Sequence, residues 1–197
     1  MANAVGAHPG GNITGVSVIT SELHGKCVEL FHDMLPSARR IGALINASDS
    51  SSKLILDQIQ HAGKITGIEI APIVSLRPLD DIDAAFATIV KEGANAVVLQ
   101  GSFPAKTAAE LALKHRLPAA TAFRPFADVG GLMSYSASFA EAFRMTALFV
   151  VKVLQGARPG DLPVEQPTKF DLAINLKTAK ALGLTIPESF LLRADEV

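Results

Sequence analysis

The chain has 197 residues, a formal net charge of −1 and a single cysteine. Hydrophobic residues make up 49% of it and charged residues 19%, enough apolar material for one sizeable domain or two small lobes. The near-neutral charge argues against an electrostatic grip on DNA or RNA. One cysteine excludes an internal disulfide and a cysteine-built zinc site.

No run of apolar residues approaches the roughly 20 that are needed to cross a bilayer. The longest, residues 145–154, is interrupted by Lys152 and is more typical of a buried helix. Residues 1–11 lack the basic start and long apolar core of a secretory signal. As written, the sequence predicts a cytoplasmic chain.

The first predicted elements are a turn, a short strand and a helix. Residues 9–12 (Pro-Gly-Gly-Asn) have turn chemistry, and residues 13–19 alternate like a short strand. Ser21 can cap a helix that runs to about Leu35 and ends at Pro36. The apolar side chains of this helix recur at helical spacing and are Leu23, Cys27, Leu30, Phe31 and Met34.

From residue 40 onward, strands and helices alternate with short connections. Strands are predicted over residues 41–45, 68–74, 96–99, 117–123 and 132–135, and helices over 54–62, 79–93 and 106–115. The first strand is a continuous apolar run, as expected where helices cover both faces of a sheet. The alternation predicts an α/β fold with a parallel sheet, helices on both faces and right-handed crossovers.

The last part of the chain has a different order of elements. A long helix is predicted over 139–154, an extended loop over 162–168, a strand over 170–176 and a helix over 177–182. Because this tail and residues 1–39 both hold elements that need a sheet, we expect them to meet in one lobe. The predicted division is a partial first lobe, residues 1–39 and 137–197, and a complete second lobe, residues 40–136.

Ligands of open parallel sheets bind beyond the carboxyl ends of the strands, a rule that selects four loops. The first contains Asn46, Ser48, Asp49, Ser50 and Ser51. Its hydroxyls and the N–H groups of the following helix N-terminus suit an anion or carboxylate. The alternative is simple capping of that helix by Ser50 or Ser51.

The second loop contains Gln100, Gly101 and Ser102. Gly101 allows a close backbone approach, and Ser102 can form a hydrogen bond with a ligand. The alternative is an ordinary turn before a helix.

The third and fourth loops bring aromatic residues to the same edge. Phe123 can wall a pocket, and Arg124 can hold a carboxylate in a bidentate manner. The alternative makes Phe126 a core residue and Arg124 a solvated charge. Tyr135, the single tyrosine, either contacts a ligand or packs with one hydrogen bond.

The residues that could support catalysis or bind a metal form no convincing set. The five histidines are His8, His24, His32, His61 and His115, and none has metal-ligand spacing. Cys27 lies on an apolar helical stripe, which favours a core position. Asp80, Asp81 and Asp83 are typical of a solvated helix start. The sequence predicts neither an enzyme nor a bound cofactor or metal.

Several stretches resemble a known family when taken together. They are residues 9–17, 35–41 and 130–135 and, above all, the tail over 155–170 and 175–184, which begins Gln-Gly-Ala-Arg-Pro-Gly-Asp-Leu-Pro. On these residues the chain resembles the substrate-binding proteins of ABC transporters, in the family that includes tryptophan- and tyrosine-type receptors. The resemblance covers essentially the whole chain.

The resemblance implies a periplasmic-binding-protein-like fold of two α/β lobes with a small solute held between them. It implies no catalysis, a membrane permease as partner, and a periplasmic or membrane-tethered extracytoplasmic location. It also implies that residues 46–52 and 100–102, together with Phe123 and Tyr135, contribute to the cleft. An amino acid or a small carboxylate is the expected solute.

Family members carry a substantial segment before the Pro-Gly-Gly-Asn motif, whereas here Met1 stands just before it. From this departure we expect an incomplete first lobe with an open sheet edge, and a homodimer that covers the exposed face. The alternative function is a truncated, dimerising ligand sensor or interaction module without a role in transport.

Overall fold

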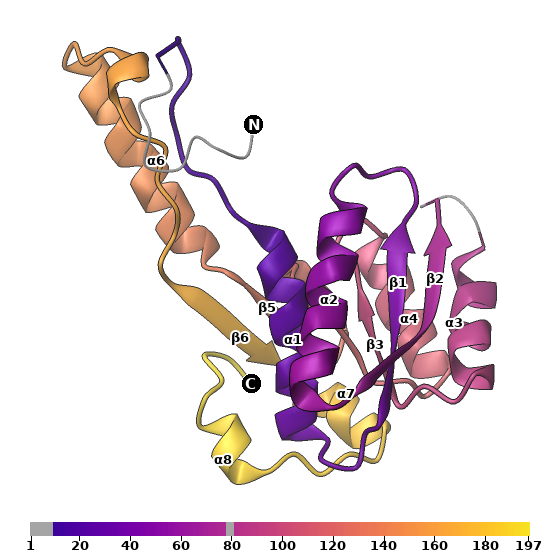
Figure 1. Ribbon diagram of the computed structural model, residues 1–197. Coiled ribbons are helices and arrows are strands. Elements are labelled where there is room, and N and C mark those ends of the chain that lie inside the picture. Colours follow the sequence, from indigo (N-terminus) through magenta and orange to yellow (C-terminus); the bar gives the residue numbers. More distant parts are fainter. Residues whose placement is uncertain (1–9, 78–80) are drawn as a thin grey trace. The chain divides into compact units, whose positions relative to one another are not determined.

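The computed structural model describes residues 10–77 and 81–197 (Figure 1). His8 and the predicted helix start at residues 79–80 lie outside the described residues. A six-stranded sheet has the order β2-β1-β3-β4-β5-β6. The strands are β1 (Arg40–Asn46), β2 (Glu69–Leu76), β3 (Ala96–Leu99), β4 (Ala119–Thr121), β5 (Met133–Ala137) and β6 (Phe170–Ile174).

The first five strands pair in parallel, and the sixth runs the other way. Ser138 N–H donates to the Lys169 carbonyl, and Asn175 N–H donates to the Leu132 carbonyl. One strand thus runs from 132 to 138 while its neighbour runs from 175 to 169, which is an antiparallel pair. The predicted α/β class is confirmed, and so is the parallel sheet for five strands; the antiparallel pairing of the sixth strand was not predicted.

Helices follow the strands in the predicted alternation. They are α1 (Thr20–Met34), α2 (Ser52–Thr66), α3 (Ile82–Lys91), α4 (Ala105–Lys114), α5 (Pro125–Asp128), α6 (Phe139–Leu154), α7 (Leu176–Ala181) and α8 (Glu188–Leu191), with a short 3₁₀ turn, η1 (Pro159–Asp161). The predictions for β3 and α6 match the observed bounds, whereas α5 and η1 were not predicted.

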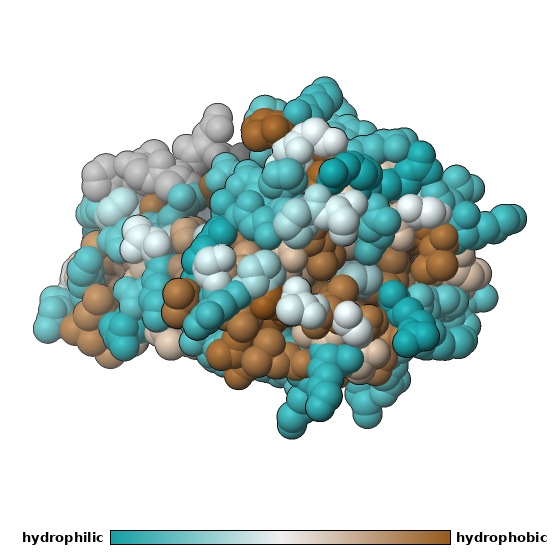
Figure 2. Space-filling model, turned by 90° about the horizontal axis from the view of Figure 1, so that it is seen from below, coloured by the Kyte–Doolittle hydropathy of each residue, from teal (hydrophilic) through white to brown (hydrophobic). Residues whose placement is uncertain are grey.

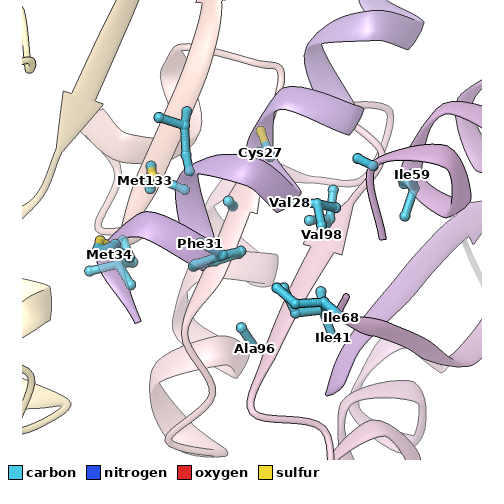
Figure 3. Close-up of a cluster of buried hydrophobic side chains, with 14 of the residues drawn as sticks. Cys27, Val28, Phe31, Met34, Ile41, Ile59, Ile68, Ala96, Val98 and Met133 are labelled. Atoms are coloured by element: carbon cyan, nitrogen blue, oxygen red, sulfur yellow. The ribbon is translucent and has the colours of Figure 1, made fainter. Parts of the chain in front are cut away.

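Two hydrophobic cores lie on opposite faces of the sheet because alternate strand residues point to opposite sides. In β3, Val98 joins the core under α1 and α2, whereas Val97 and Leu99 join the core under α3 and α4. Figure 3 shows the first core, where Val28 and Phe31 of α1 lie over the strands. Burial on both faces explains the continuous apolar runs in β1 and β3.

The chain divides into two compact units, residues 1–19 with 137–170 and residues 20–136 with 171–197. These limits differ from the predicted lobe limits of 39/40 and 136/137. Helix α1 packs extensively on α2, and β6 completes the edge of the large sheet beside β5. Helix α1 and the end of the chain from residue 171 therefore belong to the second unit, whereas residues 137–170 belong to the first.

The described part of the first unit contains α6 and extended segments. The strand predicted over 13–19 is wrong as a regular strand, because only an isolated bridge joins Val16 to Glu165. The pair is held by Ser17 N–H to the Glu165 carbonyl and by Glu165 N–H to the Gly15 carbonyl. Two hydrogen bonds align the segments without forming a sheet.

Several large apolar side chains of α6 are exposed to solvent. They are Phe139, Phe143, Leu148, Val150, Val151, Val153 and Leu154. In α6, all of which the structure describes, Phe149 is the buried residue.

Hydrophobic residues also lie on the surface of the molecule seen from below, where Figure 2 shows them among hydrophilic ones. Within the described residues, no helix has both the length and the apolar composition to cross a membrane.

Candidate functional site

A small polar cavity opens in the second unit, at the edge of the sheet where β1, β3 and β4 end. Its volume is about 180 Å³. The cavity is lined by Thr20, His24, Asp49, Ser51, Ile55, Gln100, Gly101, Ser102, Ala122 and Phe123. Ligands of open parallel sheets bind at this carboxyl edge, so its position makes the cavity the candidate site.

Gln100 is the centre of a hydrogen-bond network in the cavity wall. Its Oε1 accepts the Asn46 backbone N–H at 3.0 Å, and Ser52 Oγ lies 3.0 Å from the same oxygen. The Asn46 side-chain amide donates to Ser102 Oγ at 3.1 Å. Asn46 and Gln100 are both buried. The network joins the loops after β1 and β3 and so holds the two loops in one arrangement.

Asp49 presents an ionised carboxylate at the cavity. Its Oδ1 accepts the Ser51 backbone N–H and the Ser51 hydroxyl, each at 2.8 Å, and its Oδ2 accepts Gln100 Nε2 at 2.7 Å. These hydrogen bonds, that of the Ser51 N–H first, hold the pKa of the Asp49 carboxyl below its usual value. In the part of the chain that the structure describes, Asp49 forms no ion pair with a cation.

The alternative prediction of capping by Ser50 or Ser51 holds only in part. Ser51 occupies the N-cap position of α2, but its side chain makes no capping hydrogen bond. The reason is that Ser51 Oγ donates to Asp49 instead. The Asp49 carboxylate also occupies the Ser51 N–H, one of the groups expected to suit an anionic ligand.

His24 is a wall residue that the sequence analysis missed. It is 2% exposed, and its Nδ1 lies 2.7 Å from the Thr20 carbonyl oxygen. A carbonyl oxygen can only accept, so Nδ1 carries the proton and Nε2 of the neutral ring is an acceptor. Nε2 has no hydrogen-bond partner within residues 10–77 and 81–197. Burial lowers the pKa of His24, and the hydrogen bond to Thr20 opposes this shift.

Gly101 and Phe123 meet on the far side of the same cavity. A Cβ at position 101 would lie 2.9 Å from Phe123 Cβ, closer than side chains tolerate. Glycine is therefore required here for the loop after β3 to pass the Phe123 side chain. Phe123 itself is half-buried and gives the cavity an aromatic wall.

The structure brings together six of the ten predicted ligand-binding residues. Asp49, Ser51, Gln100, Gly101, Ser102 and Phe123 line the cavity. Asn46 lies behind them in the network, whereas Ser48 and Ser50 are exposed and do not line the cavity. Tyr135 packs against the core under α1 and α2, and this burial raises its pKa.

The alternative prediction for the third loop is confirmed for Phe126 as a core residue, whereas Arg124 is wrong as a solvated charge because its side chain is 18% exposed and paired. Phe126 is 1% exposed and belongs to the core under α3 and α4. Arg124 forms ion pairs with Asp128 and Glu196 and lines a separate cavity near the C-terminus. Its guanidinium charge is therefore already paired with two carboxylates.

Three other candidate residues from the sequence, Cys27, Asp81 and Asp83, have structural roles. Cys27 is fully buried, and burial raises the pKa of its thiol to about 12. Asp81 caps α3 by accepting the Ala84 N–H, and Asp83 pairs with Lys114 and His115. Among the described residues, no three His, Cys, Asp or Glu side chains come together as a metal site.

A polar, partly aromatic cavity at the carboxyl edge of a parallel α/β sheet is a position at which such folds hold small molecules. A family model described as "ABC transporter substrate binding protein" matches residues 5–197. The chain belongs to this family, and the resemblance noted in its sequence is confirmed.

Individual relatives agree with this assignment. A tyrosine-binding protein of Clostridioides difficile is 24% identical over 183 residues, which are 89% of this chain and 51% of that protein. A domain from Streptococcus pneumonia, solved in complex with L-Trp, is 28% identical with a TM-score of 0.82 and is matched over 100% of this chain and 67% of its own. A conserved domain protein from Vibrio cholerae has a TM-score of 0.83 at 24% identity, over 96% of this chain and 64% of its own.

The chain is shorter than these relatives. It spans about half the length of the tyrosine-binding protein and about two thirds of the two solved structures. The likeness to the Vibrio cholerae structure, at 24% identity, concerns the fold alone.

Proposed function

We propose that this protein is the solute-binding component of an ABC import system and binds an amino acid without catalysing a reaction. The cavity at the carboxyl edge of the sheet is the observation that carries the proposal. Its volume of about 180 Å³ is below the 300–1,000 Å³ typical of complete small-molecule sites. This supports a site that a second surface completes, as in a cleft between two lobes.

The amino acid is proposed from the relatives and the cavity chemistry together. One relative is named for tyrosine and another was solved with L-Trp, and both of these ligands are aromatic amino acids. The Phe123 wall suits an aromatic side chain, and the polar wall around Asp49 and Gln100 suits a charged head group. We take the six predicted residues that line the cavity as solute contacts.

The transport role gives the protein its partners and its location. A solute-binding protein of this family delivers its ligand to a membrane permease and works outside the cytoplasm, in the periplasm or tethered to the membrane. We propose the same for this chain on the basis of its family.

A thermal-shift panel tests the proposal. The purified protein is heated with each of the twenty L-amino acids, selected D-enantiomers and a set of small carboxylates. A ligand at a hundred times its Kd adds roughly 2.7 kcal/mol, which for a chain of this size raises Tm by about 5–10 °C. A rise with an L-amino acid and not with its D-enantiomer is the expected result.

Two serine-to-valine variants test where the solute binds. Ser102→Val changes a cavity residue, whereas Ser50→Val makes the same change at an exposed position outside the cavity. We expect the first variant to reduce the ligand-induced shift and the second to leave it unchanged. A panel in which no amino acid raises Tm would contradict the proposed function. Equal ligand-induced shifts in both variants would contradict the proposed site.

A homodimer is a second part of the proposal. The exposed apolar side chains of α6 form a surface that a second copy of the chain would cover. The mass of the protein in solution tests this expectation.

A further inference from the structure

The His24 imidazole has a hydrogen-bonding capacity that the fold does not use. Nδ1 donates to the Thr20 carbonyl at 2.7 Å, so the ring is held with Nε2 as an acceptor. This atom is buried and has no partner in the described part of the chain. A buried polar atom without a partner costs free energy, so its retention in a cavity wall calls for a ligand or a water molecule.

The charge of the cavity wall indicates which kind of ligand group fits. Asp49 is ionised, and His24 is neutral and accepting. Among the described residues, those that line the cavity include no lysine and no arginine. A wall with one carboxylate, one accepting imidazole and no cation is complementary to a cationic hydrogen-bond donor.

We infer that His24 Nε2 and the Asp49 carboxylate together accept N–H bonds from the ammonium group of the solute. The inference rests on the proposed function, because it assigns the head group of an amino acid to this cavity. It makes His24 a residue that determines specificity: the residue selects for an amine over a neutral or acidic group at the same position.

The inference also reverses one expectation from the sequence. A carboxylate was expected to bind at the N-terminus of α2 or at Arg124. The Ser51 N–H at that terminus is occupied by Asp49, and Arg124 is paired with Asp128 and Glu196. The ionised Asp49 carboxylate at that terminus would also repel the carboxylate of an amino acid, which we therefore expect at another part of the site.

The first experiment needs only the unsubstituted protein. Isothermal titration compares the amino acid that gives the largest thermal shift with its α-hydroxy and α-deamino analogues. The α-hydroxy analogue keeps one neutral O–H donor, and the deamino analogue has none. We expect affinity to fall about 10- to 100-fold for the deamino analogue, with the α-hydroxy analogue between them. Equal affinity for the amino acid and the deamino analogue would overturn the inference.

The second experiment uses variants of His24. His24→Leu keeps a similar volume but removes the acceptor, whereas His24→Gln places an amide oxygen at a similar distance from the backbone. His32, which is exposed two turns further along α1, provides the matched controls His32→Leu and His32→Gln. We expect His24→Leu to weaken amino-acid binding about tenfold or more, His24→Gln to recover most of it, and both controls to bind like the unsubstituted protein.

The outcomes separate this inference from the proposed function. Amino-acid binding that His24→Leu leaves within twofold would overturn the inference alone, because Nε2 would then contribute nothing to solute binding. Binding of the deamino analogue should be insensitive to His24→Leu, since it has no ammonium group. If no amino acid binds the unsubstituted protein, both the proposed function and the inference fail. Far-UV circular dichroism checks folding, and the analogue comparison stands even if His24→Leu does not fold.

Discussion

Burial fixes the protonation state of one residue, His24, and through it the hydrogen-bonding character of a cavity wall. The ring cannot ionise without placing a charge in a site that is 2% exposed, and its one short hydrogen bond uses the Nδ1 proton. The unfolded chain has no such restriction. The difference between the two states makes the free energy of unfolding depend on pH.

We predict that His24 destabilises the native state in acid. Its native pKa is below 6.5, so as pH falls through 6.5 the unfolded chain binds a proton that the native chain does not. The stability lost through this residue therefore grows as pH falls below 6.5 and is absent above about pH 7.5.

Urea unfolding of the unsubstituted protein and of His24→Leu between pH 5.5 and 7.5 measures this effect. The stability of the variant relative to the unsubstituted protein should improve toward low pH, whereas His32→Leu should show no such trend. A difference between the two proteins that stays constant over this range would show that His24 takes up a proton equally in both states.

Gln100 connects the two loops of the site, and its removal should destabilise the fold. Gln100→Leu deletes the acceptor of the buried Asn46 N–H and a donor to Asp49. We predict a loss of about 1–3 kcal/mol in the free energy of unfolding, because a buried donor is left without a partner. Gln60→Leu, at a half-buried position on α2, is the control and should change stability by about 0.5 kcal/mol or less. Equal losses in both variants would refute the role given to Gln100.

At the scale of elements, local pattern predicted the type of most helices and strands but not the neighbours of each one. The apolar run of β3 and the long stretch of helical periodicity in α6 were sufficient to predict where these two elements begin and end. The alternation in β6 predicted a strand equally well, yet pairing with β5 depends on contacts between residues distant in sequence. Helix α5 has four residues, too few for a period to be visible.

The residues around the candidate cavity were predicted to the level of their loops and not one by one. The rule that ligands bind at the carboxyl edge selects the loops after β1, β3 and β4 without further information. The place of His24 in the cavity was not predicted, because this histidine lies outside the four loops and has no metal-ligand spacing. Only the packing of α1 against the ends of the strands shows that its ring lines a cavity.

Strand β1 and helix α3 pack closely at Gly42 and Ile89, so substitutions at these two positions should destabilise the fold. A Cβ at Gly42 would lie 2.7 Å from Ile89 Cγ2, so the helix can approach the strand only over a glycine. We expect Gly42→Ala to cost about 1–3 kcal/mol by overpacking, and Ile89→Ala to cost about 2–5 kcal/mol by leaving a cavity.

The double variant should cost less than the sum of the two single changes, since the smaller side chain at 89 makes room for the new methyl group. Chemical unfolding of all four proteins completes the cycle. If the losses in the free energy of unfolding from the two single changes simply add, β1 and α3 move apart freely and are not tightly packed at this contact.

At the scale of the whole molecule, the two units differ in how they use their apolar residues. The second unit buries two cores against one sheet. Helix α6 of the first unit instead exposes Phe139, Phe143, Val150 and Leu154, whose spacing of four, seven and four residues places them on one side of the helix. Such a stripe is typical of a helix that packs against another surface.

The proposed homodimer follows from this stripe and has a matched test on the same helix. Light scattering after gel filtration should give twice the mass of one chain for the unsubstituted protein. Leu154→Lys changes a stripe residue that is 82% exposed, and Leu148→Lys makes the same change at a residue that is 57% exposed and lies on the opposite side.

A buried lysine in the interface would lose its hydration, so we expect Leu154→Lys to shift the protein toward the monomer and Leu148→Lys to leave the dimer intact. A monomeric unsubstituted protein at micromolar concentration would show that a second copy does not cover the stripe. A dimer that survives both substitutions would place the interface elsewhere on the molecule.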